Sequence, residues 1–323
     1  MSTVLAIDVG GTGTRLRLAP ARSEEPAGPD DVRTLTADGA RVGRTGSDVA
    51  AVVVDLVRRA RDRWPADPPA AVGVGATGLA SLVDDHDGLL RDLVAASGCA
   101  RVAVAADAVT AHLGALGGEP GAVIAVGTGA IALGTDLDRR WTRVGGWGHL
   151  YDDRGSGAWI GIAALQAAIR AHDGVGGAGR ALLAAATDRL GAPPTWTRLL
   201  TLDDRAGVLA SLAPDVVALA DAGDPAASGI VHRAGQLAAE SLAAALVDGI
   251  PRVAAATGGL TAAPRYAEAL AAEFARLAPD ADLRPSRGAP LDGAVELARR
   301  AAAGRAPATL PRLLWSTAPA AGG

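Results

Sequence analysis

Apolar residues along this chain recur with two alternating spacings, and the alternation predicts a layered α/β protein. Short apolar runs bounded by Gly, Pro or Asp indicate strands, whereas apolar positions three and four apart indicate helices. Strands are expected at 4–8, 14–18, 70–76, 101–105, 122–126, 131–135, 141–144 and 253–256. Helices are expected from 49 to about 60, from 225 to about 248, and at 88–96, 107–116, 264–277 and 290–303. Strands that alternate with helices in this way are typical of an α/β fold.

Polar residues mark where some of these elements begin. Ser47 or Asp48 stands where it can cap the helix that starts at Val49. The pair Asp224-Pro225 supplies an N-cap and a first helical residue for the long helix that follows. The Pro-rich stretch 24–31 is expected to be a loop.

A strand, a glycine turn and a second strand occur twice, over residues 4–18 and 122–135. The first turn reads Gly10-Gly11-Thr12-Gly13 and the second reads Gly127-Thr128-Gly129. The same order of elements in both places predicts a duplicated α/β domain. We expect a lobe over 1–110, a second over 111–289, and a helix over 290–303 that returns to the first lobe. The remaining tail, 304–323, is expected to be loose, although Leu313, Leu314 and Trp315 can hold part of it.

Composition fits a globular protein and removes several classes of function. The chain has 323 residues, of which 49% are hydrophobic and 20% charged, so it can bury a sizeable core. Its net charge is −4 without a basic block, and a nucleic-acid partner is therefore not expected. The lone Cys99 excludes a disulfide framework and a multi-cysteine zinc or iron–sulfur site within one chain.

Two further absences exclude particular chemistry and particular locations. Every basic residue is Arg, which excludes the lysine of a Walker loop and a lysine Schiff base. No run of 18 apolar residues occurs, and the apolar stretch 4–7 is too short for a signal sequence. We therefore expect a cytoplasmic protein without a membrane partner.

The first glycine turn has the composition of a phosphate site. Glycine amides and threonine hydroxyls donate to phosphate oxygens, and Asp8 at the strand end can hold Mg²⁺ through water. A plain hairpin turn explains the same residues equally well. Gly127-Thr128-Gly129 and Thr257-Gly258-Gly259-Leu260 also follow strands. Each of these two indicates only a turn when taken alone, although glycines of the second could lie against an adenine or a ribose.

Asp107 follows the expected strand 101–105 at the start of a helix. A carboxylate at the carboxyl end of a strand lies where α/β sheets bind ligands. There it can accept the proton of a sugar hydroxyl during phosphoryl transfer. A simple N-cap aspartate is the alternative interpretation.

Residues 145–159 form the most distinctive segment, Gly-Gly-Trp-Gly-His-Leu-Tyr-Asp-Asp-Arg-Gly-Ser-Gly-Ala-Trp. Carboxylates bind sugar hydroxyls, and the face of a tryptophan packs on the C–H side of a pyranose. The alternative is a glycine-rich loop with core tryptophans. His149 has no ligand spacing with the other histidines, so we predict a local hydrogen bond for it and no metal site.

In this order the motifs resemble the N-acetylglucosamine kinases of the actin-like ATPase superfamily and, more broadly, the BadF/BadG/BcrA/BcrD ATPase group. The resemblance covers residues of about 4 to 303, and the 145–159 segment is its most specific part. It implies a two-lobed, ribonuclease H-like α/β fold of duplicated mixed sheets with flanking helices. It also implies ATP and Mg²⁺ as cofactors, a cleft between the lobes as the active site, and a homodimer.

The resemblance further assigns a role to each motif. The residues that match the ATP-binding motifs are Gly10, Gly11, Thr12, Thr14, Gly127, Thr128, Gly129, Gly258 and Gly259. The positions that match the sugar segment are Gly146, Trp147, Gly148, His149 and Asp153. Asp8 matches the metal position, and Asp107 matches the catalytic base that also contacts the sugar.

The implied activity is ATP-dependent phosphorylation of the 6-hydroxyl of an amino hexose, with N-acetylglucosamine first. A glucosamine kinase and a kinase of another hexose or a muramic-type amino sugar are alternatives, as is a nucleotide-binding sugar sensor without turnover. A dehydratase activator needs two cysteines per chain for its shared cluster and is disfavoured. A sugar-responsive repressor would need a helix-turn-helix ahead of the first strand.

Two departures from the family pattern bear on which sugar is used. Ala130-Ile131 stand where the family often has Ser-Asn, and an apolar pair can pack on an acetyl methyl. Asp152 adds a carboxylate beside Asp153, and an inward carboxylate would favour a 2-ammonium group. Because neighbouring side chains on a tight loop point apart, we expect Asp152 to face solvent.

Overall fold

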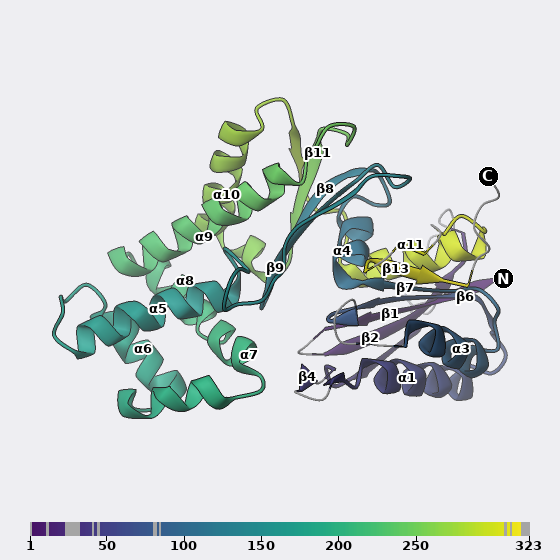
Figure 1. Ribbon diagram of the computed structural model, residues 1–323, viewed down its shortest axis with the longest axis horizontal. Coiled ribbons are helices and arrows are strands. Elements are labelled where there is room, and N and C mark those ends of the chain that lie inside the picture. The colour runs from purple at the N-terminus through teal and green to yellow at the C-terminus, as the bar shows by residue number, and fades with distance from the viewer. Residues whose placement is uncertain are drawn as a thin grey trace. The chain divides into compact units, whose positions relative to one another are not determined.

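The structure is a computed structural model that describes residues 2–10, 13–22, 33–40, 42–43, 46–79, 83, 85–306, 309–310 and 312–317. Its chain separates into two compact units (Figure 1). Unit 1 comprises Met1–Glu119 and Ser286–Gly323, and unit 2 comprises Pro120–Pro285. The predicted lobe bounds remain predictions, and each unit is described by itself.

Unit 1 is built on a six-stranded mixed sheet of order β13-β7-β6-β1-β2-β3. Its strands are β1 (Thr3–Val9), β2 (Thr14–Pro20), β3 (Arg33–Ala37), β6 (Pro69–Ala76), β7 (Val102–Ala106) and β13 (Leu314–Ser316). The short pair β4 (Val42–Gly43) and β5 (Gly46–Ser47) lies outside this sheet. Strands β1, β6 and β7 run parallel, so their carboxyl ends meet at one edge.

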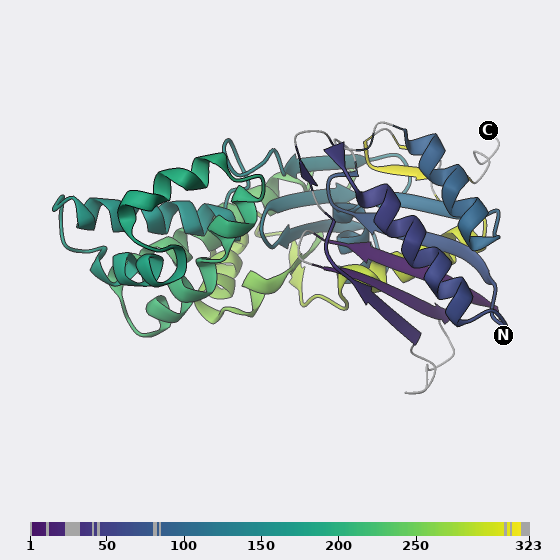
Figure 2. The same cartoon turned by 90° about the horizontal axis from the view of Figure 1, so that it is seen from below.

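Helices cover both faces of this sheet. Those of unit 1 are α1 (Val49–Arg63), α3 (His86–Ser97), α4 (Asp107–Ala115) and α11 (Pro290–Ala302). Helices α4 and α11 pack on one face and α1 and α3 on the other (Figure 1). Seen from below, α1 runs across the strands it covers (Figure 2). Its buried residues recur at helical spacing: Val49, Val53, Val54, Leu56, Val57 and Ala60.

Unit 2 repeats the central strands of unit 1. Its sheet has the order β10-β9-β8-β11-β12, in which β8, β9 and β10 form an antiparallel meander and β11 lies parallel to β8. The strands are β8 (Gly121–Val126), β9 (Ala130–Thr135), β10 (Trp141–Gly145), β11 (Val253–Thr257) and β12 (Asp282–Arg284). In unit 1, β1, β2 and β3 form the corresponding meander and β6 the parallel neighbour. The α/β fold of duplicated mixed sheets is thereby confirmed.

The rest of unit 2 is mostly helical and closes a second, separate core. Its helices are α5 (Gly157–His172), α6 (Arg180–Leu190), α7 (Arg205–Ala210), α8 (Ala213–Asp221), α9 (Pro225–Ala244) and α10 (Pro264–Leu277), with 3-10 turns η1 (Pro193–Thr201) and η2 (Gly259–Ala262). Asp224 caps α9 as predicted, because its carboxylate accepts from the Ala227 amide at 2.8 Å. The helix ends at Ala244, short of the expected 248.

Two of three other expectations can be compared with the described residues. At the start of α1, Asp48 is the N-cap residue, and the Ser47 hydroxyl accepts from the Val49 amide at 3.2 Å. The predicted loop 24–31 lies outside the described residues. In the tail, where we expected that Leu313, Leu314 and Trp315 can hold part of the chain, Leu314–Ser316 form β13, which pairs antiparallel with β7, and Trp315 stacks on His86 with ring centroids 3.8 Å apart.

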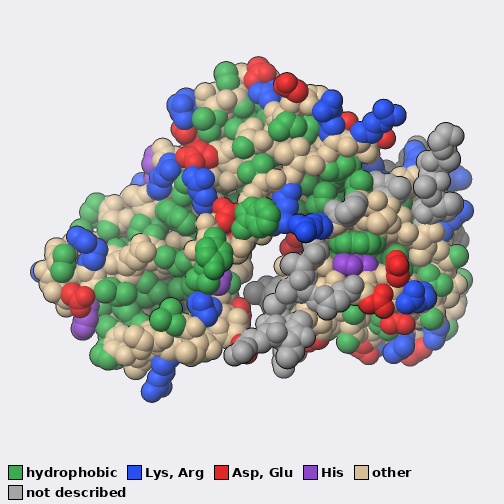
Figure 3. All heavy atoms as spheres, in the orientation of Figure 1, with side chains coloured by type: hydrophobic (Ala, Val, Ile, Leu, Met, Phe, Trp, Pro, Cys, Tyr) green, Lys and Arg blue, Asp and Glu red, His purple; other side chains and the backbone are tan. Residues whose placement is uncertain are grey.

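The surface carries acidic and basic side chains interspersed over the face shown in Figure 3. Among the described helices, no single one is long and apolar enough to cross a membrane. One bent pair, Arg205–Asp221 with Pro225–Ala244, meets that test by length and composition when the two helices are taken together.

Candidate active site

Within unit 1, Asp8 and Asp107 meet at the edge where the parallel strands end. Asp8 lies near the end of β1, and Asp107 is the first residue of α4, directly after β7. Burial and the neighbouring Asp107 carboxylate raise the pKa of Asp8 to about 6, against an opposing effect of Arg15. Asp107 Oδ1 also accepts from the Ala108 amide at 2.8 Å. The topology therefore places two partly buried carboxylates at one sheet edge.

The first glycine turn is described only in part. Gly11 and Thr12 lie outside the described residues. The Gly10 amide donates to the Gly13 carbonyl at 3.0 Å, as in a tight hairpin turn. Thr14 is buried, and its hydroxyl donates to the Asp38 carbonyl at 2.9 Å, so the proton of this hydroxyl is used within the fold.

Within unit 2, the second glycine turn is held from behind by the start of α5. The amides of Gly157 and Ala158 donate to the carbonyls of Gly127 and Thr128 at 2.8 and 3.1 Å. Gly127 and Thr128 are themselves exposed. The Gly127 amide itself donates to the Gly129 carbonyl at 2.9 Å. An exposed turn of this kind can offer its remaining backbone amides to an anion.

The third glycine turn lies against the strand that leads to the second. Gly258 has φ of 109°, and a Cβ there would come within 2.1 Å of the Val126 carbonyl oxygen. Only glycine fits this position, for conformational and steric reasons together. Gly259 has open space around its Cα. The structure thus brings the turns at 127–129 and 257–260 together in unit 2.

The 145–159 segment is held in shape by side chains that fold back on it. Arg143 donates to the carbonyls of Gly145 and Gly146 at 3.0 and 2.5 Å, and its guanidinium carbon lies 4.7 Å from the centre of the Trp147 ring. Trp147 itself is 68% exposed. A cation over an indole face stabilises an exposed ring in one orientation. Sequence patterns did not single out Arg143, since a lone Arg on a strand carries no motif.

The two adjacent carboxylates of the segment accept hydrogen bonds from amides of their own loop. Asp152 Oδ2 accepts from the Trp147 amide at 3.2 Å in a solvent-exposed hydrogen bond, and the side chain is partly buried. That Asp152 points away from the sugar stays a prediction. Asp153 is buried and has φ of 50°, and its Oδ1 accepts from the Gly148 amide at 3.4 Å. Burial raises the pKa of Asp153 in spite of its backbone hydrogen bonds.

His149 lies beside these carboxylates. Burial and the nearby Arg205 lower the pKa of His149, and Asp153 opposes them. Its Nε2 is buried and has no hydrogen-bond partner within the part of the chain that the structure describes. The predicted local hydrogen bond is thus not seen at Nε2. Among the described residues, no three His, Cys, Asp or Glu side chains gather where they could hold a metal ion by themselves.

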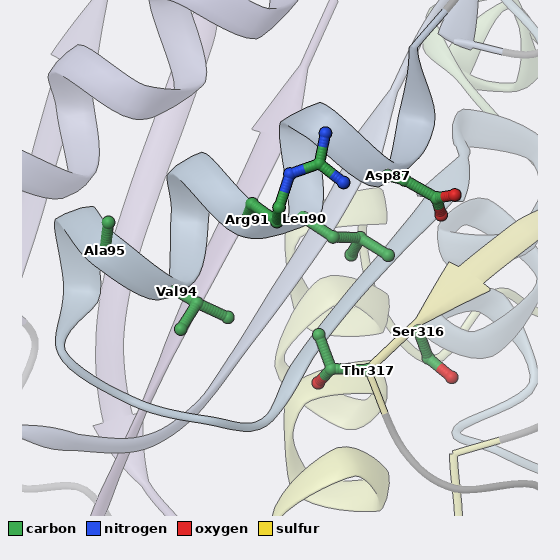
Figure 4. Close-up of a pocket in the computed structure, with 7 residues that line it drawn as sticks. All are labelled: Asp87, Leu90, Arg91, Val94, Ala95, Ser316 and Thr317. Atoms are coloured by element: carbon green, nitrogen blue, oxygen red, sulfur yellow. The ribbon is translucent and has the colours of Figure 1, made fainter.

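A pocket of about 460 Å³ lies elsewhere on unit 1, between α3 and the segment that ends β13 (Figure 4). Asp87, Leu90 and Arg91 line it from the helix, and Ser316 and Thr317 line it from the strand end. It contains none of the predicted site residues. We therefore keep the sheet edges and glycine turns as the candidate active site.

Comparison with known proteins agrees with this geometry. The sequence profile of the BadF/BadG/BcrA/BcrD ATPase family matches residues 5–295, and the chain belongs to this family. It is 28% identical over 180 residues to an N-acetylmuramic acid/N-acetylglucosamine kinase of Clostridium acetobutylicum. It is 29% identical over 185 residues to an N-acetyl-D-glucosamine kinase of Dictyostelium discoideum. These matches cover 54% and 53% of this chain, and 55% and 56% of the relatives, so the chain spans about half the length of each.

Solved structures extend the likeness over almost the whole chain. A candidate N-acetylglucosamine kinase from Chromobacterium violaceum matches with a TM-score of 0.67 and 26% identity, over 92% of this chain and 98% of that one. A ROK family glucokinase from Streptomyces griseus, in complex with glucose and AMPPNP, matches with a TM-score of 0.58 and 21% identity, over 93% and 100%. The second likeness shows the fold alone, which is the actin-like ATPase fold of sugar kinases.

Proposed function

We propose that this protein is an ATP-dependent sugar kinase that phosphorylates the 6-hydroxyl of an amino hexose, with N-acetylglucosamine as the preferred substrate. The observation that carries the proposal is the pair Asp8 and Asp107 at one sheet edge of an ATPase fold. Phosphoryl transfer to a sugar needs a base at the hydroxyl and oxygen ligands near the phosphates. The names of the relatives that match parts of the chain point to the same chemistry.

Asp107 acts as the general base in this proposal. Its carboxylate accepts the proton of the 6-hydroxyl as the oxygen attacks the γ-phosphorus of ATP, and ADP leaves with the β–γ bridging oxygen. The backbone amides of the turns at 10–13 and 127–129 orient the phosphates, with Thr128 as a further donor. Gly258 and Gly259 lie against the adenosine.

In this proposal Asp8 is the residue that would bind Mg²⁺. A carboxylate that is buried beside a second carboxylate is costly to ionise, and a nearby divalent cation removes that cost. Mg²⁺ is usually held by one or two carboxylates together with substrate phosphates. When bound, the cation would neutralise charge on the phosphates.

The sugar is bound by the 145–159 segment in this proposal. Asp153 accepts hydrogen bonds from sugar hydroxyls, and Trp147 packs one ring face on the pyranose, with Gly146, Gly148 and His149 around it. Asp152 accepts one backbone hydrogen bond, from the Trp147 amide, and keeps its negative charge. The preference for N-acetylglucosamine over glucosamine is instead supported by the names of the two relatives and by the apolar pair Ala130-Ile131, which can pack on an acetyl methyl. We further propose a cytoplasmic homodimer without nucleic-acid or membrane partners.

The test is a panel of hexoses and amino sugars with ATP and Mg²⁺, followed by nucleotide release and by mass analysis of the product. The proposal expects a sugar 6-phosphate, with the highest kcat/KM for N-acetylglucosamine. Binding of sugar and nucleotide by calorimetry without any release of ADP would instead identify a sensor. A preference for glucosamine that is lost in Asp152→Gly would overturn the assignment of the substrate.

A further inference from the structure

The end of the 145–159 segment contacts one glycine turn of unit 2 and the helix that follows the other. Its amides at Gly157 and Ala158 donate to the turn at 127–129. From the other side, the Tyr266 hydroxyl donates to the Gly155 carbonyl at 2.9 Å. Tyr266 lies in the first turn of α10, the helix that begins directly after the 257–260 turn and η2. Gly155, Gly157 and Ala158 thus join the proposed sugar segment to the 127–129 turn and to α10, the helix that follows the 257–260 turn.

The residues that form this connection, Gly155, Ser156 and Tyr266, have little conformational freedom. Tyr266 is fully buried, and burial raises the pKa of its hydroxyl, which therefore stays protonated as a donor. Gly155 has φ of 85°, and a Cβ there would lie 2.4 Å from the Ala234 carbonyl oxygen of α9. Ser156 is fully buried and caps α5 through the Trp159 amide at 3.1 Å. A displacement of α10 must therefore be passed on to Gly155 or break the hydrogen bond.

We propose that Tyr266 is a positioning residue, whose hydrogen bond to Gly155 couples nucleotide binding at the glycine turns to the sugar affinity of the 145–159 segment. This inference rests on the proposed function. The inference adds to the proposed function that, within unit 2, binding of one substrate changes the affinity for the other. The coupling is reciprocal, so sugar must tighten nucleotide binding by the same factor.

The experiment measures the Kd of N-acetylglucosamine by calorimetry with and without saturating AMPPNP and Mg²⁺. The ratio of the two values is the coupling factor. We expect a factor above one in the wild-type protein and a factor at least about threefold smaller in Tyr266→Phe, since one buried hydrogen bond is lost. The matched control is Thr187→Val, which removes another hydroxyl that donates to a backbone carbonyl, at 2.7 Å from Leu183 in α6. It should keep the wild-type factor.

The outcomes separate this inference from the proposed function. A wild-type protein that binds neither ligand would overturn the function and the inference with it. Binding of both ligands with the same coupling factor in wild type and Tyr266→Phe would overturn the inference alone, whatever happens to Tm or to the absolute Kd. If Tyr266→Phe does not fold, hydrogen exchange on the wild type decides. AMPPNP and Mg²⁺ without sugar should slow exchange over residues 145–158, and an unchanged rate would refute the coupling.

Discussion

Asp8 carries a carboxylate that the fold makes costly to ionise. Its folded pKa of about 6 lies above the unfolded value of 3.8. A raised folded pKa adds stability that is fully present below pH 3.8 and is lost as the pH rises through 6. We therefore expect Asp8→Asn to raise the free energy of unfolding by about 1–3 kcal/mol at pH 7.5, with little gain at pH 3.5. Thermal melts of the wild type and of Asp8→Asn between pH 3.5 and 7.5 measure this difference in stability. Equal melting temperatures at pH 7.5 would contradict the prediction.

In the proposed mechanism, Asp107 removes a proton from the sugar hydroxyl and does not bind ATP. Asp107→Asn keeps the shape of the side chain and its ability to accept from the Ala108 amide. We expect kcat to fall by about 10²–10⁴, the usual contribution of a general base, while AMPPNP affinity stays near the wild-type value. Asp87→Asn, an acidic residue of the separate α3 pocket, is the control and should leave kcat unchanged. Near wild-type turnover in Asp107→Asn would contradict the assignment of Asp107 as the general base.

Helices α4 and α11 cross so closely that glycine is required where they touch. A Cβ at Gly293 in α11 would lie 1.7 Å from the Thr110 carbonyl oxygen, and one at Gly114 in α4 would lie 2.2 Å from the Ala289 carbonyl oxygen. Backbone atoms on both sides cannot rotate away as a side chain can. The close crossing lets α11 lie over β1 and β6 and reach the sheet of unit 1.

Substitution at this crossing should therefore be severe. We expect Gly293→Ala to lower the free energy of unfolding by about 3 kcal/mol or more, because one helix must shift. Gly229→Ala is the matched control, since Gly229 lies exposed in α9 with nothing within 4 Å of its Cβ position. It should raise stability by up to about 1 kcal/mol through helix propensity. Urea unfolding of both variants gives the comparison, and equal effects would show that the crossing is adaptable.

The residues that the structure describes form two hydrophobic cores, one in each unit. Unit 2 is a continuous stretch, Pro120–Pro285, whereas unit 1 needs both ends of the chain. Without 286–323, the unit 1 sheet would lose α11 from one face and β13 from its edge. Such a loss exposes apolar surface and unpaired backbone groups together.

Fragments that correspond to the two units should therefore differ in whether they fold alone. We expect residues 120–285 alone to give one cooperative thermal transition. We expect residues 1–119 alone to lack one and to regain it on addition of the peptide 286–317. Circular dichroism and calorimetry measure both results. A cooperative transition of 1–119 without the peptide would show that α11 and β13 are dispensable for the unit 1 core.

Local pattern was enough to predict most elements and the fold class. Apolar runs that end in Asp8, Asp107 and the glycine turns could be recognised as strand ends, because strand and turn preferences act over a few residues. The Asp224 cap of α9 was predicted for the same reason. Membership of the ATPase family followed from the order of the motifs, which a linear sequence preserves.

Contacts between distant residues were decided only by the tertiary structure. Whether the tail joins β7 depends on an edge strand some 210 residues away in the chain. The hydrogen bond from Tyr266 to Gly155 joins residues 111 positions apart. Contacts within one loop, such as Asp152 with the Trp147 amide and Arg143 with the Trp147 ring, likewise depend on which partners the fold leaves available. The raised pKa of Asp8 likewise needs the burial and the Asp107 charge that sheet packing creates. Sequence specifies which groups can interact, and packing decides which of them meet.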